Sequence, residues 1–441
     1  MSTVDTLIHS RWVIPVEPDN TVLEHHSVAM HNGRIVDILP TEVARQRYEA
    51  TQVVEKPSHA LIPGLVNAHT HASMTLLRGI ADDLPLMEWL QNHIWPAEGR
   101  WVGAEFVFDG TLLALAESLR GGVTCMNEMY FFPDQAAKAA VQVGARMVAG
   151  LIVIDFPTVW AANTDQYIEK ALELHDRYRG HPLISTAFAP HAPYTVSDGP
   201  LSRIRVLADE MDIPIHIHVH ETAGEIEQSI EVHGKRPLAR LDALGLLSPR
   251  LLAVHMTQLT AAEIDRCADT GVHVLHCPES NMKLASGFCP VDTLLKAGVN
   301  VALGTDGAAS NNDLDMFGEM RSAALLGKVV ASDASAVPAH TALRMATLNG
   351  AKALGLDGEI GSIVTGKAAD LVAIDLGSIE LQPIYHPISQ IVYAAGRQHV
   401  TDVWVAGRRV VHDRALTTLD EAAVRAKTAE WQGRISARTP A

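Results

Sequence analysis

The sequence predicts an α/β fold: a (β/α)8 barrel of the TIM type, with a small β-sandwich domain formed from both chain ends. After Pro63 and Gly64, eight apolar, strand-like runs alternate with long stretches rich in Ala, Leu and Glu. Such alternation is typical of repeated βα units, and eight parallel strands close a barrel. Short β-rich segments occupy the first sixty residues and return after about Gly361.

The eight candidate barrel strands are LVNAHTH, VTCMNEM, ARMVAGLIVID, LISTAFAPH, IPIHIHVHE, LLAVHM, GVHVLHC and VNVALGTD. Helical segments such as 110–120 and 200–211 lie between them. In this fold the carboxyl ends of the strands carry the active site. Polar residues that end these runs are therefore the first candidates for function.

The chain ends contain β-rich segments of a different kind. TLIHSRWVIPV and HSVAMHNGRIVDILP carry turn signals at Asn32-Gly33 and follow one another without a helix, and DLVAIDL and DVWVAGRRVVH resemble them. We therefore expect residues 1–61 and 362–441 to form the small β domain together. The barrel, residues 62–361, would then be an insertion between its two halves.

Composition narrows the class of protein. The chain has 441 residues, 47% of them hydrophobic, and a formal net charge of −16, which opposes binding to nucleic acid and favours a small-molecule substrate. Its start has no basic segment followed by an apolar run, and no long uncharged apolar stretch follows later. We expect a cytoplasmic protein without membrane association.

Cysteine spacing restricts how a metal ion can be held. The four cysteines lie far apart and form no C-x-x-C pair, so the sequence indicates neither a disulfide framework nor a thiolate zinc site. Any metal ion must therefore be bound by histidine and carboxylate side chains.

Histidines at two strand ends suggest such a site. His69 and His71 leave the same face of the first strand candidate, although an H-x-H pair alone is equally often structural. His216, His218 and His220 share one face of the fifth candidate, and not all three can bind one ion. His218 fits best, because a carboxylate three residues later, Glu221, can act as general acid and base beside the metal. His216 and His220 would then be core or supporting residues.

Two further strand ends carry ligand-type residues. His255 ends the sixth candidate and Asp306 the eighth. Each alone is readily explained as a hydrogen-bonded core group, but four such strand ends together indicate one metal centre. The fourth candidate contains His191 and no lysine that could bridge a second ion, so we expect one ion per chain. The ligands alone do not identify the ion, because zinc, iron(II), manganese and cobalt all suit them.

Longer motifs support a family resemblance. LIPGLVNAHTH, the spacing of His218 and Glu221, GTDGAASNN and GKAADLVAID resemble the amidohydrolase superfamily. MTLLRGIADDLPLMEWLQNHIWPAE, APHAPYTVSD and HCPESNMKLASG are similar, within it, to the 5′-methylthioadenosine/S-adenosylhomocysteine deaminases. The resemblance covers nearly the whole chain.

The resemblance implies a function and a set of roles. The expected reaction is hydrolytic deamination of 5′-methylthioadenosine, of adenosine and, more weakly, of S-adenosylhomocysteine by a metal-bound hydroxide, giving the inosine analogue and ammonia. The resemblance implies one divalent ion per chain, zinc by family habit, and its implied ligands are His69, His71, His218 and Asp306. The implied catalytic groups are Glu221 as proton shuttle, His255 as a polarising neighbour of the attacking water, and Asp306 as a second proton relay.

The resemblance also implies how substrate is held. Glu98 would bind the ribose hydroxyls, and His191, Glu221 and Asp306 would contact the substrate as well. Taken without its motif, Glu98 is better explained as a solvated acid. The family also favours a homo-oligomer.

Two other functions compete with this one. Related barrels act on guanine, cytosine, pterins or chlorotriazines, and only a substrate with a diol needs Glu98. A metal-free binding or assembly module is the second alternative, and the complete ligand set argues against it.

The 5′ substituent of the substrate is the last expectation. Between Arg146 and Lys170 no residue is basic, whereas Phe156, Val159 and Trp160 offer apolar surface. Methylthioadenosine should therefore be preferred over adenosylhomocysteine. The alternative is that a distant arginine, such as Arg78 or Arg321, reaches the charged homocysteine tail.

Overall fold

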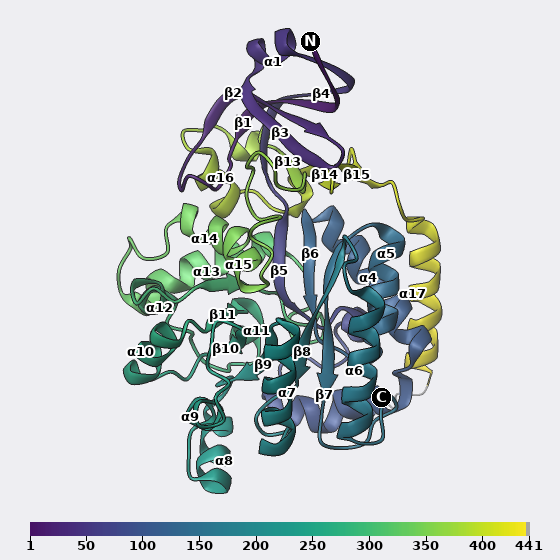
Figure 1. The fold of residues 1–441 in the computed structure, drawn as a ribbon, viewed down its shortest axis with the longest axis vertical. Coiled ribbons are helices and arrows are strands. Elements are labelled where there is room, and N and C mark those ends of the chain that lie inside the picture. Colours follow the sequence, from purple (N-terminus) through teal and green to yellow (C-terminus); the bar gives the residue numbers. More distant parts are fainter. Residues whose placement is uncertain (438–441) are drawn as a thin grey trace.

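The computed structural model describes residues 1–437 and contains two eight-stranded sheets, one above the other in Figure 1. The lower sheet is a barrel whose neighbouring strands are all parallel and follow chain order from β5 to β12. An isolated parallel bridge between Thr70 and Asp306 joins its first and last strands. The strands are β5 (Leu65–Thr70), β6 (Val123–Glu128), β7 (Arg146–Val153), β8 (Ile184–Pro190), β9 (Ile215–Val219), β10 (Leu251–His255), β11 (His273–His276) and β12 (Val301–Leu303).

All eight barrel strands lie within the predicted runs, so the predicted (β/α)8 barrel is confirmed. Their side chains are almost all buried, as expected of parallel strands covered on both faces. The helices of the barrel region are α4 (Ala104–Arg120), α5 (Pro133–Val143), α6 (Thr164–Tyr178), α7 (Asp198–Met211), α8 (Ala223–His233), α9 (Pro237–Ala243), α10 (Ala261–Thr270), α11 (Pro278–Lys283), α12 (Val291–Lys296), α13 (Met316–Ala331), α14 (Ala339–Met345) and α15 (Leu348–Ala353).

Helix α4 begins six residues before the segment that the sequence predicted. The added residues include Phe106 and Val107, which have modest intrinsic helix propensity but are fully buried. Packing of these side chains therefore outweighs their local preference.

The upper sheet combines the two ends of the chain. Its strand order is β16-β15-β14-β13-β4-β1-β2-β3, and β13 pairs antiparallel with β4. At the turn between β2 and β3, Asn32 and Gly33 both have positive φ, as their sequence predicts. The strands are β1 (Ser2–Val13), β2 (Leu23–His31), β3 (Arg34–Pro40), β4 (Tyr48–Pro63), β13 (Leu371–Asp375), β14 (Val400–Val405), β15 (Arg408–His412) and β16 (Ala415–Leu416).

Polar and aromatic contacts fix this sheet to the barrel. The Arg146 guanidinium on β7 donates two hydrogen bonds to Asp370 (2.7 and 3.1 Å), just before β13. Helix α17 (Glu421–Ser436) lies along α4, and Trp431 donates to Asp109 (2.8 Å) and packs edge-on against Phe106. The remaining helices around the sheet are α1 (Thr41–Arg47), η3 (Ile379–Leu381), α16 (Pro387–Tyr393) and η4 (Arg397–His399). The predicted division after residues 61 and 361 stays a prediction.

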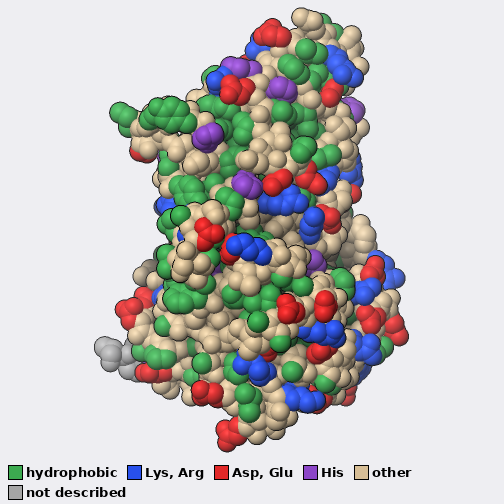
Figure 2. All heavy atoms as spheres, turned by 90° about the vertical axis from the view of Figure 1, so that its left-hand side faces the viewer, with side chains coloured by type: hydrophobic (Ala, Val, Ile, Leu, Met, Phe, Trp, Pro, Cys, Tyr) green, Lys and Arg blue, Asp and Glu red, His purple; other side chains and the backbone are tan. Residues whose placement is uncertain are grey.

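Charged side chains of both signs lie on the surface of the molecule. Acidic and basic side chains are interspersed over the face shown in Figure 2 rather than gathered by sign. Within residues 1–437, no helix has both the length and the apolar character needed to cross a membrane.

Candidate active site

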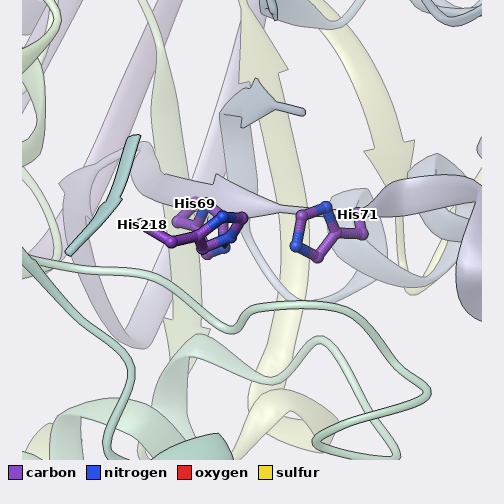
Figure 3. Close-up of side chains that lie close together, drawn as sticks. All are labelled: His69, His71 and His218. Carbon is purple, nitrogen blue, oxygen red and sulfur yellow. Dashed lines mark hydrogen bonds between the residues drawn. The ribbon is translucent and has the colours of Figure 1, made fainter. Parts of the chain in front are cut away.

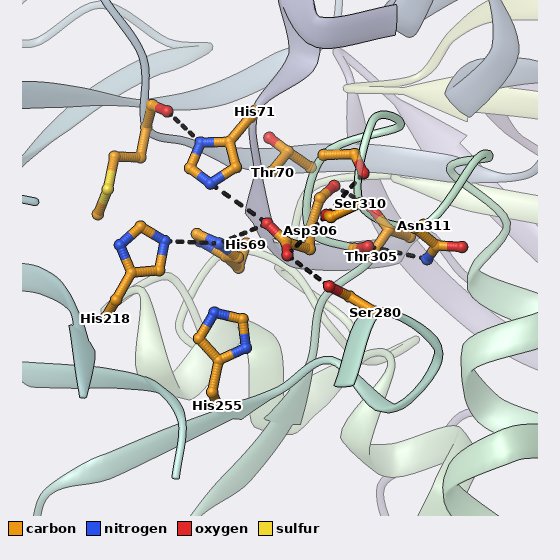
Figure 4. Close-up of polar contacts among 12 residues, drawn as sticks. His69, Thr70, His71, His218, His255, Ser280, Thr305, Asp306, Ser310 and Asn311 are labelled. Carbon is orange, nitrogen blue, oxygen red and sulfur yellow. Dashed lines mark hydrogen bonds and ion pairs between the residues drawn. The ribbon is translucent and has the colours of Figure 1, made fainter. Parts of the chain in front are cut away.

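Four of the predicted residues meet at the carboxyl end of the barrel. His69 lies on β5, His71 directly after it, His218 on β9 and Asp306 after β12. Asp306 Oδ1 is 3.2 Å from Nε2 of His69 and 3.2 Å from Nε2 of His71, and the Nε2 atoms of His69 and His218 are also 3.2 Å apart. Figure 3 shows the three imidazoles together, and Figure 4 adds the carboxylate.

Backbone carbonyls orient two of these rings. His71 Nδ1 donates to the carbonyl of Met129 (2.5 Å) and His218 Nδ1 donates to that of His191 (2.7 Å). A carbonyl oxygen can only accept, so Nδ1 carries the hydrogen in both rings and Nε2 faces the centre. The ring of His69 is oriented by another histidine, because its Nδ1 lies 2.8 Å from Nε2 of His216.

This arrangement fits a single tetrahedral cation. Four ligands at the usual zinc distances lie about 3.3 Å from one another, close to the three separations given above. Burial lowers the pKa of His218 well below its usual value and so favours the neutral ring. The lone pair on its Nε2 then faces another ring nitrogen, a contact that a shared positive ion stabilises.

The second carboxylate oxygen of Asp306 is held by hydroxyl groups. Ser280 and Ser310 donate to Oδ2 at 2.7 and 2.8 Å (Figure 4). Burial opposes the charge of this carboxylate, but the hydrogen bonds and charges of His69 and His71 outweigh it and hold the pKa of Asp306 well below its usual value. Oδ1 is thus left facing the imidazoles.

A glycine permits this close approach. A Cβ atom on Gly304, just after β12, would lie 2.7 Å from the His69 backbone nitrogen and 2.8 Å from its Cβ. A larger residue would therefore force β12 away from β5. Glycine at this position lets Asp306 reach the histidines of β5.

The backbone is strained where three strands end. His220 after β9, His255 at the end of β10 and Asp306 after β12 have φ of 56°, 75° and 61°. Residues with a Cβ atom rarely adopt this left-handed conformation, which costs on the order of 1–3 kcal/mol and clusters at functional sites. This conformation turns the chain sharply at the strand ends that carry the candidate ligand and acid–base residues.

Glu221 and His255 lie beside the four converging residues. His255 Nε2 is 3.7 Å from Glu221 Oε2, and His255 Nδ1 forms a 2.9 Å hydrogen bond with Asn281. Burial raises the pKa of Glu221, so the energy difference between its protonated and ionised forms is reduced. Glu225 accepts hydrogen bonds from the backbone nitrogens of His220 (3.1 Å) and Glu221 (2.7 Å), which fixes the turn that carries Glu221.

A cavity of about 290 Å³ opens onto these groups. Its walls come partly from the segment after β5, which contains η1 (Ala72–Leu77), α2 (Leu86–Trp89), η2 (Leu90–Ile94) and α3 (Trp95–Trp101). Of the eight predicted site residues, His69 alone is missing from its lining, since it is fully buried behind the others. The lining includes His71, Glu98, His191, His218, Glu221, His255 and Asp306.

Glu98 and His191 contribute polar groups to a largely apolar wall. Glu98 is on α3, and burial raises its pKa to about 7 against the opposing effects of Tyr130 and His71. His191 follows β8, and its Nδ1 forms a 2.9 Å hydrogen bond with Thr195. Both side chains therefore face a ligand placed in this cavity.

Several supporting residues were missed by the sequence reasoning. Glu128, at the end of β6, accepts hydrogen bonds from the Thr70 hydroxyl (2.6 Å) and the Ala72 backbone nitrogen (2.8 and 3.0 Å), and burial raises its pKa to about 7. Its place at a strand end was a usable signal. No such signal marks the other three residues. The partners of Tyr130 and Ser280 lie at least 26 residues away along the chain. Ser310 reaches Asp306 only through a loop whose path the sequence does not specify.

The fold and the site define a metal-dependent hydrolase built on a (β/α)8 barrel. The amidohydrolase family model matches residues 60–410. A 5-methylthioadenosine/S-adenosylhomocysteine deaminase of Teredinibacter turnerae is 50% identical, with 99% of each chain covered. One from Saccharophagus degradans is also 50% identical, over 98% of this chain and 97% of the relative. The chain belongs to the amidohydrolase family and, within it, to the group of these deaminases.

Two solved structures share the fold of this chain. A zinc-bound adenosine deaminase from Xanthomonas campestris is 58% identical, with a TM-score of 0.98 and 99% of each chain covered. An atrazine chlorohydrolase from Arthrobacter aurescens shares the fold, at 23% identity and a TM-score of 0.90, with 97% of this chain and 100% of that chain covered.

Proposed function

We propose that this protein deaminates 5′-methylthioadenosine and adenosine, and S-adenosylhomocysteine more weakly, to the inosine analogues and ammonia. The observation that carries the proposal is that one cavity joins the converging histidines and Asp306, together with Glu221, to a further carboxylate, Glu98. The names of the 50% identical relatives and of the zinc-bound X. campestris enzyme support the same chemistry.

One divalent ion, zinc by analogy with the X. campestris enzyme, would be held by the four converging residues. When bound, such an ion supplies Lewis acidity and makes a water molecule acidic enough to attack at neutral pH. The proposed ligands are His69, His71, His218 and Asp306.

Glu221 is the proposed proton shuttle. It would accept a proton from the attacking water and deliver it to N1 of the adenine ring, so that attack at C6 leaves no anionic ring. His255, 3.7 Å from Glu221, would polarise the same water, and Asp306 would pass the second proton to the departing amine. A raised pKa suits Glu221 for holding a proton between these two steps.

Steady-state rates on adenosine, methylthioadenosine, adenosylhomocysteine, guanine and a chlorotriazine test the function directly. We expect turnover of the three adenine nucleosides and little of the other two compounds. Turnover of guanine or the triazine alone would contradict the proposal.

Glu98 is the proposed partner of the ribose diol. Glu98→Ala is expected to lower kcat/KM for adenosine about 10- to 100-fold, because a carboxylate accepting hydroxyl hydrogen bonds contributes roughly 1.5–3 kcal/mol. The measurement compares adenosine with 2′,3′-dideoxyadenosine, which lacks both hydroxyls. The substitution should change kcat/KM for the dideoxy substrate only slightly. An equal loss on both substrates would exclude a diol partner.

The cavity favours an uncharged 5′ substituent. Among the described residues that line the cavity, none is Lys or Arg. The lining includes the apolar side chains of Phe156 and Val159, which are 46% and 56% exposed. Neither of the two arginines considered above lines the cavity. Arg78 donates to Glu117 and to the Asn312 carbonyl, and Arg321 donates to the Ala395 carbonyl.

The kcat/KM for methylthioadenosine is therefore expected to exceed that for adenosylhomocysteine by about 10- to 100-fold. This factor corresponds to the one charge-assisted hydrogen bond that the homocysteine tail would lack in this cavity. Competition between equal concentrations of the two substrates measures this ratio. A preference for adenosylhomocysteine would mean that a basic residue outside the cavity lining moves to meet its tail.

We further propose that the enzyme works in the cytoplasm, since its four cysteines are buried free thiols. The expected homo-oligomer stays a prediction, which light scattering of the purified protein would test.

A further inference from the structure

Tyr130 connects the two ends of the candidate active site. It lies two residues beyond β6, is 5% exposed and lines the cavity. Its hydroxyl donates a 2.6 Å hydrogen bond to Glu98 Oε1. The roles proposed above give Tyr130 no part.

The bond has a defined direction and a clear electrostatic effect. A phenol hydroxyl next to a carboxylate donates, and a hydrogen bond to an ionised acceptor is stronger than one between neutral groups. Glu98 is only partly exposed to solvent, so its charged form lacks part of the water that would otherwise stabilise it. Tyr130 replaces part of that hydration and leaves Oε2 available to accept from a ligand.

The preceding residue holds a proposed metal ligand. The Met129 carbonyl accepts from His71 Nδ1 at 2.5 Å, and the rings of His71 and Tyr130 have centroids 6.3 Å apart. Two consecutive residues after β6 therefore contact His71 on one side and Glu98 on the other. The position of the carboxylate relative to the reaction centre is set by this short segment.

We propose that Tyr130 is a positioning residue for the ribose: it holds the Glu98 carboxylate in the orientation that accepts the diol, at a fixed distance from the reacting C6. The proposal rests on the deaminase function proposed above. Tyr130 acts through Glu98 and need not touch the reacting atoms.

Tyr130→Phe tests the proposal because it removes one oxygen atom and keeps the ring. We expect kcat/KM for adenosine to fall about tenfold, mainly through a higher KM, and to change less than about twofold for 2′,3′-dideoxyadenosine. Bound metal per chain should stay the same. Tyr48→Phe is the matched control, since Tyr48 also donates to a carboxylate, Asp37 at 2.9 Å, but on the small sheet.

A double-mutant cycle separates positioning from packing. In a Glu98→Ala background, Tyr130→Phe should have little further effect on adenosine turnover, because its partner is already missing. Additive losses in the cycle, or equal losses on the ribose and dideoxyribose substrates, would overturn the proposal. So would an unchanged KM for adenosine in Tyr130→Phe. Absence of deaminase activity in the unmodified protein would instead overturn the proposed function.

Discussion

Glu221→Gln is expected to keep its metal ion and to lose at least about 100-fold in kcat, the usual contribution of a general acid–base group. Glu221 lies beside the four proposed ligands rather than among them, 3.7 Å from His255 and on a turn held by Glu225. Glutamine preserves the shape of the side chain but cannot shuttle a proton, so the variant should still bind the metal ion while its kcat falls.

Metal analysis and steady-state kinetics on the same preparation measure both quantities. Glu227→Gln is a suitable control, because Glu227 lies exposed on α8, six residues along the chain from Glu221. Turnover near that of the unmodified protein in a metal-loaded Glu221→Gln sample would remove Glu221 from the role of proton shuttle.

Complete removal of the metal is expected to reduce deamination to background and re-addition to restore it. Elemental analysis of active protein should give about one divalent ion per chain, because the described residues of β8 include no lysine that could bridge a second ion. His218→Ala should lose the ion, whereas His233→Ala, at the exposed end of α8, should retain it.

Two outcomes would contradict this prediction. Two ions per chain in fully active protein would exclude a mononuclear centre. Undiminished activity after metal removal would exclude metal-assisted hydrolysis altogether.

The barrel strands could be predicted because parallel strands buried on both faces form continuous apolar runs. The ends of the elements were less predictable. The sequence indicated one β segment over 402–412, but the structure divides it into β14 and β15 at a turn where Ala406 and Gly407 have positive φ. Nothing in the alanine itself marks that turn.

The residues of the candidate site also differ in how far the sequence could predict them. His69, His71 and Asp306 could be proposed because each lies at or near a strand end, where chain order alone determines position. Tyr130 could not, because its bond to Glu98 depends on how η2 and α3 fold over the barrel mouth. Its importance follows from a loop conformation that no local pattern specifies.

The split sheet has a consequence for synthesis of the chain. Strand β4 pairs with β13 through residues about 300 positions apart, such as Ala60 and Ile374. A ribosome therefore releases β1 to β4 long before their last neighbour exists, and the edge of β4 stays open while the barrel is made. Open strand edges invite pairing with other chains. The nascent protein is thus most exposed to aggregation during translation of the barrel, and this exposure ends only when β13 closes the edge.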